Sequence, residues 1–185
     1  MKKTNNIHKM VLAAMFLAIA YVLPFFTGQI PQIGAMLCPM HLPVFICGFV
    51  CGAPWGGMVG FVAPLLRSVT LGMPPLFPTA VCMSLELTAY GVTSGFLYKI
   101  FPKKKLFVYV SLLSAMIVGR MVWGMAMFAC MGITGGEFSL AAFVAGAVTN
   151  AIPGMILQIV LIPILVMLLN KTRDSVENIK IVGVR

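Results

Sequence analysis

The chain has 185 residues, of which 61% are hydrophobic and only 9% are charged, and its formal net charge is +9. A soluble domain carries roughly 25% charged residues, so the composition excludes a soluble enzyme and, in spite of the net charge, a nucleic-acid-binding protein. The length allows about six membrane spans of roughly 20 residues each, so we expect one integral membrane domain over residues 1–185.

Six apolar segments follow one another along the chain. The predicted spans are residues 10–26, 40–53, 56–71, 77–98, 106–131 and 140–169, followed by a short cytoplasmic tail, 170–185. The second segment is only about 21 Å long as a helix, against a bilayer core of about 30 Å, so it spans comfortably only where the bilayer thins or other helices surround it. Residues 28–39 and 72–78 are rich in Gly and Pro, and we expect uncharged outer loops that act either as lids or as tight connections.

The basic residues predict the orientation of the spans. With six spans, all but two of the 13 Lys and Arg residues fall on one side of the membrane, and the opposite side has none. The positive-inside rule places the basic side in the cytoplasm, so both termini are predicted to be cytoplasmic. The residues on this side are Lys2, Lys3, Lys9, Lys99, Lys103, Lys104, Lys105, Lys171, Arg173, Lys180 and Arg185.

Three charged residues fall inside the predicted spans, where a charge costs at least about 2.5 kcal/mol. They are Arg67, Glu86 and Arg120, and Asn150 on a fourth span adds a polar side chain at a similar depth. At about 1.5 Å per residue, all four lie between the bilayer midplane and its outer edge. We expect them to form the floor and walls of a pocket that opens outward. Alternatively, Glu86 pairs with Arg67 or Arg120, and the ion pair only locks the helix bundle.

An aromatic residue accompanies two of these charges. Tyr90 follows Glu86 at i+4 and Trp123 follows Arg120 at i+3, so each ring lies on the same helix face as its charge. Arg67 and Arg120 with one glutamate leave the pocket with a net positive charge, which suits an anionic group such as a carboxylate. The pattern therefore predicts a small organic ligand rather than a bare ion.

Small residues recur at four-residue spacing on the first four spans, which lets helix backbones approach closely. The pairs are Ala14/Ala18, Gly48/Gly52, Gly56/Gly60 and Gly91/Gly95. We expect most of these faces to serve internal packing. On the first span, Ala13, Ala14, Ala18 and Ala20 leave a smooth surface, which is a candidate for docking another membrane protein.

The cysteines, methionines and histidines form no metal or catalytic motif. His41, Cys47 and Cys51 are soft enough to suit Cu(I), but the 15 methionines are spread along every span and are interpreted as flexible core filler. A Gly-rich nucleotide loop, a zinc motif and a Ser/His/Asp arrangement are also missing from the sequence. We therefore expect no enzyme activity, no metal and no cofactor.

Several stretches together resemble the substrate-binding S component of an energy-coupling factor (ECF) transporter. The likeness covers nearly the whole chain, and it includes the size, the six spans, the inside termini, Gly48 and the Ala14-x-x-x-Ala18 pattern. The stretches are CPMHLPVF at 38–45, GGMVGFVAPLLR at 56–67, GMPPLFP at 72–78, ELTAYG at 86–91, GRMVWG at 119–124 and NAIPG at 150–154.

The resemblance implies a multi-pass protein of the bacterial plasma membrane that captures a vitamin or related micronutrient near the outer face. Such a component docks through its first span onto a membrane T subunit with two cytoplasmic ATPases, which hydrolyse the ATP. Mapped onto this chain, Ala14 and Ala18 form the docking face. The implied ligand contacts are Arg67, Glu86, Arg120 and Asn150, with Tyr90 and Trp123 beside them. The two arginines favour a carboxylate-bearing vitamin, with pantothenate ahead of niacin, biotin-like or folate-like acids.

Two other classes of function compete with this interpretation. In a small channel or autonomous secondary carrier, Arg67, Glu86 and Arg120 would form a conduction or proton-coupling path. In a structural membrane scaffold, the same charges would only stabilise the bundle. Uptake by the chain alone, without ATP, would favour the carrier.

Overall fold

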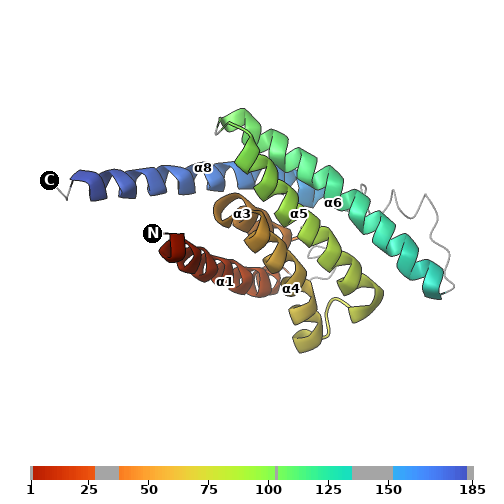
Figure 1. Cartoon of the computed structure of the whole chain (residues 1–185). Coiled ribbons are helices and arrows are strands. Elements are labelled where there is room, and N and C mark those ends of the chain that lie inside the picture. Colours follow the sequence, from red (N-terminus) through yellow and green to blue (C-terminus); the bar gives the residue numbers. More distant parts are fainter. Residues whose placement is uncertain (1, 28–37, 103, 135–151, 183–185) are drawn as a thin grey trace.

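A computed structural model of the chain describes residues 2–27, 38–102, 104–134 and 152–182. These residues form six helices and one short helical turn, without a strand among them, which confirms the predicted all-helical class (Figure 1). The helices are α1 (Lys2–Thr27), α3 (His41–Cys51), α4 (Ala53–Leu71), α5 (Val81–Ile100), α6 (Lys105–Thr134) and α8 (Ile152–Val182), and the turn η1 (Leu76–Ala80) leads into α5. Most of the loop predicted at 28–39, the first part of the predicted sixth span and Asn150 lie outside the described residues.

Among the described residues, four helical segments are long and apolar enough to cross a membrane: Asn6–Phe26, Leu76–Ile100, Lys105–Ile133 and Ile152–Leu169. α4 spans 19 residues, but its glycines, prolines and Arg67 lower its hydropathy. α3 has only 11 residues, all of them buried except Val50, because α1, α4, α5 and α8 pack against it. Other helices therefore surround the short second segment, as its length predicted.

A single residue, Gly52, separates α3 from α4. The break predicted after residue 53 is therefore too long, since α4 already begins at Ala53. Pro54 lies in the first turn of α4, where its missing N–H leaves no helical hydrogen bond unmade. Gly52 has φ 97° and ψ 172°, a conformation that is essentially restricted to glycine. The chain thus reverses between the two helices without a loop.

Glycines let α4 and α5 approach closely where they cross. A methyl group on Gly60 of α4 would overlap the backbone of Leu87 in α5, and one on Gly91 of α5 would overlap the backbone of Gly56 in α4. The small-residue pairs of these helices therefore serve internal packing, as predicted. Gly52 is the exception, because it forms the turn between α3 and α4.

α1 packs one face against α3 and α4 and leaves the opposite face uncovered by the described helices. Ala13, Phe16 and Ala20 are buried in the core, whereas Ala14 and Ala18 are exposed. The prediction that all four alanines share one smooth surface is therefore wrong, because Ala13 and Ala20 belong to the core. Ala14 and Ala18 alone lie on the outer face, and its role in docking stays a prediction.

α8 packs against α3 and α6 through a buried face that includes Gln158, Ile162 and Val166. The helix then continues to Val182, beyond the end of its apolar part at Leu169, so the predicted tail from residue 170 is helical up to Val182. Its cytoplasmic position stays a prediction. The stretch 171–182 contains neither proline nor glycine, so nothing in its backbone ends the helix earlier. In Figure 1 this part of α8 extends past the bundle, on the same side as the beginning of α1.

The beginning of α1, the α3–α4 junction and the end of α5 meet at one end of the bundle. Lys9, Gly52 and Lys99 line the same cleft there, so we call this end the lysine end. Lys9, before the first span, and Lys99, after the fourth, thus lie at the same end of the bundle, in agreement with the predicted topology. Which side of the membrane they face remains a prediction from the positive-inside rule.

Candidate functional site

A buried polar cluster is centred on the carboxylate of Glu86 in α5. The Arg120 Nη1 atom of α6 lies 3.0 Å from Glu86 Oε1, and the Glu86 side chain is only 3% exposed. The Tyr90 hydroxyl donates a hydrogen bond of 2.6 Å to the same oxygen. His41 Nε2, at the beginning of α3, lies 3.9 Å from it. We call these four residues the Glu86 cluster.

Local packing holds the Tyr90 side chain at the carboxylate. Tyr90 lies one helical turn after Glu86, so the two side chains share a face of α5. Its ring packs against Phe45 with 4.7 Å between centroids. On the other side, Gly119 leaves room for the ring, since a methyl group there would overlap it. A residue without a side chain next to Arg120 therefore allows α6 to bring its guanidinium to the carboxylate.

The cluster retains unused hydrogen-bonding capacity. In the part of the chain that the structure describes, both ring nitrogens of His41 and the Nε of Arg120 are buried without a hydrogen-bond partner. An unsatisfied buried polar group costs about 1–3 kcal/mol, and native proteins leave few such groups. Three such nitrogen atoms beside one ion pair could form hydrogen bonds with a polar ligand.

Cys38 precedes α3 and lies close enough to Arg120 and Glu86 to interact with both. Burial raises the pKa of the Cys38 thiol above its ordinary value, although Arg120 opposes the shift, so the group remains a neutral thiol. Its backbone adopts φ 47°, a left-handed conformation that is uncommon for a residue with a side chain. Strain of this kind gathers at functional sites.

Arg67 lies apart from the Glu86 cluster, against α1. Its Nη1 donates a 3.0 Å hydrogen bond to the Tyr21 carbonyl oxygen, and its guanidinium lies 5.1 Å from the centroid of the Phe25 ring. Of the two pairings that the sequence left open for Glu86, the structure thus has the one with Arg120. Arg67 ties α4 to α1, and its contact with a ligand remains a prediction.

Two predicted ligand contacts, Trp123 and Asn150, do not belong to the Glu86 cluster as described. Trp123 is half-buried on α6, about one turn beyond Arg120, and Asn150 lies outside the described residues. His41 and Cys38 were not predicted as site residues. The histidine interrupts an otherwise apolar segment, and a buried polar residue in a span is the one signal that could have singled it out.

The predicted docking residues lie on the exposed face of α1. Ala18 lines a shallow hollow of about 360 Å³ whose other walls are apolar side chains of the same helix. Ala14 lines a second hollow of about 180 Å³ between α1 and α4. The surface around both alanines is therefore apolar.

The family model described as "ECF transporter, substrate-specific component" matches residues 8–166. The chain belongs to this family. The match includes the whole Glu86 cluster and both alanines of the α1 face. Comparison with curated proteins and with solved structures gave no match.

Membership makes this S component a multi-pass membrane protein that binds a small molecule for transport and is not an enzyme. Members of this family interact with a T subunit and with ATPase subunits. Within the described ranges, no three His, Cys, Asp or Glu side chains come together in a way that could hold a metal ion.

Proposed function

We propose that this S component captures a vitamin or related micronutrient at the Glu86 cluster and delivers it by docking through α1. The observation that carries the proposal is the buried ion pair beside three buried nitrogens that lack hydrogen-bond partners in the described residues. A polar ligand would satisfy these nitrogens, which apolar packing leaves unpaired. The ATP is hydrolysed by the partner subunits, and this chain needs no cofactor of its own.

The substrate class that fits best is a carboxylate-bearing vitamin, with pantothenate as the first candidate. Arg120 presents its guanidinium within the cluster, and this group favours carboxylates. Because Arg67 lies against α1, the Glu86 cluster holds one arginine and one glutamate rather than an excess of positive charge. Its ligand therefore has to offer hydrogen-bond donors to Glu86 as well as an anionic group to Arg120. Pantothenate, with a carboxylate, an amide and hydroxyl groups, does both.

Mass spectrometry of the ligand retained by the purified full chain tests the proposal most directly. We expect one small molecule with a carboxylate, and titration with pantothenate should quench tryptophan fluorescence. Arg120→Lys should weaken this binding roughly tenfold or more, because lysine lacks the planar fork of donors. A chain that retains no small molecule and binds none of the candidate acids would overturn the proposal. Gradient-driven uptake by the chain alone in ATP-free liposomes would instead favour the secondary carrier.

Docking through α1 requires the small side chains at Ala14 and Ala18, since a partner helix approaches closely only over small residues. Ala14→Trp is expected to abolish co-purification with a co-expressed T subunit while leaving ligand binding intact. The matched control is Ala129→Trp, the same change at an exposed alanine of α6. Equal loss of the T subunit in both variants would contradict docking through this face.

A further inference from the structure

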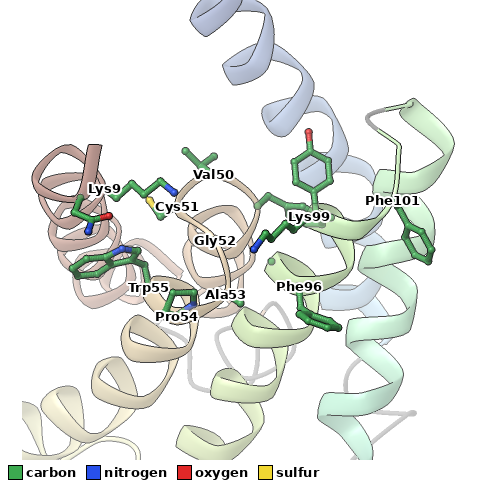
Figure 2. Close-up of a pocket in the computed structure, with 14 residues that line it drawn as sticks. Lys9, Val50, Cys51, Gly52, Ala53, Pro54, Trp55, Phe96, Lys99 and Phe101 are labelled. Atoms are coloured by element: carbon green, nitrogen blue, oxygen red, sulfur yellow. The ribbon is translucent and has the colours of Figure 1, made fainter. Parts of the chain in front are cut away.

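A cleft of about 520 Å³ opens at the lysine end of the bundle, formed by the beginning of α1, the α3–α4 junction and the end of α5 (Figure 2). None of its described lining residues belongs to the Glu86 cluster. Along α5, Lys99 lies about 20 Å beyond Glu86 at 1.5 Å per residue. The cleft is therefore separate from the proposed substrate site, and the function proposed above does not use it.

Two lysines from different helices converge on this cleft. Figure 2 shows the Lys9 side chain of α1 and the Lys99 side chain of α5 extending from opposite sides toward the turn at Gly52. Asn6 adds a polar side chain on the side of α1, and no acidic residue is found among the described residues that line the cleft. Among the side chains that the structure describes here, the cleft thus carries two positive charges and no negative one.

The first turn of α4 also faces the cleft through Ala53, Pro54 and Trp55. The first N–H groups of a helix have no partner within it, and its N-terminal end carries a partial positive charge, so this end favours anions. Gly52 adds no side chain, and the space where one would lie is empty for 4 Å. An anion can therefore approach the backbone at the point where the two lysines converge.

The remaining walls are aromatic and apolar. Phe49, Trp55, Phe96, Tyr98 and Phe101 all line the cleft. Of these, Trp55 and Tyr98 are of the types that are enriched at the boundary between the hydrocarbon core and the headgroups of a membrane. The cleft therefore combines a cationic floor with walls that tolerate acyl chains.

We propose that the cleft is a phosphate-binding site, in which Lys9, Lys99 and the first turn of α4 hold the phosphate group of an anionic phospholipid or a soluble phosphate. Ammonium groups and a helix N-terminus are the usual protein partners of this group. The two sources share this chemistry, and they differ only in whether the aromatic walls contact acyl chains.

Fluorescence of Trp55 measures occupancy of the cleft in the full chain. The sequence contains two tryptophans, so Trp123→Phe leaves Trp55 as the only reporter. The detergent-purified protein is titrated with phosphatidylglycerol, with phosphatidylcholine and with inorganic phosphate. A response to phosphatidylglycerol but not to phosphatidylcholine assigns the site to an anionic lipid. A saturable response to inorganic phosphate alone assigns it to a soluble phosphate.

Lys9→Gln and Lys99→Gln are each expected to weaken the binding about fivefold. Lys104→Gln is the matched control, because Lys104 is exposed, lies directly before α6 and does not line the cleft. In the chain with all its lysines, a high concentration of KCl should also weaken the binding, since salt screens exposed charges. The proposal is overturned if neither phosphate source changes the fluorescence, if salt has no effect, or if Lys104→Gln weakens binding as much as the other two.

Discussion

Replacing Glu86 by glutamine is expected to destabilise the protein. The amide has nearly the same shape and still accepts the hydrogen bond from the Tyr90 hydroxyl, which is 2.6 Å long in the native chain. What the change removes is the negative charge 3.0 Å from Arg120 Nη1. The variant therefore tests the ion pair and leaves the packing intact.

The expected cost follows from the burial of the pair. Removing one partner of a buried ion pair costs about 3–5 kcal/mol, because the other charge is left uncompensated. The Arg120 side chain is 16% exposed, so water reaches it and we take the lower bound, about 3 kcal/mol. On the scale of soluble domains of this size, about 2–4 °C per kcal/mol, the thermal midpoint should fall by about 6–12 °C.

Thermal unfolding in detergent, followed by size-exclusion chromatography, measures this shift. The matched variant is the double substitution Glu86→Gln with Arg120→Gln, which removes both charges and should recover most of the lost stability. It should not recover ligand binding, since the anionic group of the ligand has lost its arginine. A shift of less than about 2 °C for Glu86→Gln would refute the argument that the charges form a desolvated pair.

Two other substitutions probe the packing around the site. Gly119→Ala should lower the thermal midpoint and weaken ligand binding, because the new methyl group overlaps the Tyr90 ring and overpacking of a core costs about 1–3 kcal/mol. Gly132→Ala on the same helix has empty space around the new methyl group and should change neither measurement. Cys82 and Cys130 have their sulfur atoms 3.6 Å apart, about 1.5 Å more than a disulfide requires. Mild oxidation of the purified protein should therefore join α5 to α6, as intact-mass measurement and tryptic mapping would detect, and the peptide link should be absent from Cys82→Ser.

The two arginines inside the predicted spans show what the sequence can and cannot predict. Depth along a helix follows from counting residues, so Arg67, Glu86 and Arg120 were expected at one level. Counting does not give the direction in which a side chain points around the bundle. Arg67 donates a hydrogen bond to the Tyr21 carbonyl oxygen, whereas Arg120 pairs with Glu86. On the sequence alone, the two arginines were equally good partners for Glu86.

His41 shows a second limit. It lies in a segment that is too short to cross a membrane unaided, and on the sequence alone it was considered only as a copper ligand together with Cys47 and Cys51. Its place beside Glu86 depends on α3 being surrounded by other helices, with His41 itself only 2% exposed. That arrangement arises where Gly56, Gly60 and Gly91 allow α4 and α5 to cross closely, a contact between distant parts of the chain.

The sequence by itself determined the membrane class, the helical segments and the family, because hydropathy, charge placement and motif spacing are local or additive properties of the chain. It also located the charged residues that membrane burial makes costly, and so it identified Glu86 and Arg120. Only the tertiary structure decided which charge pairs with which, that His41 completes the cluster and that Lys9 and Lys99 face one cleft. Each of these depends on the rotation of helices about their axes, which close packing between distant segments sets and which no local pattern encodes.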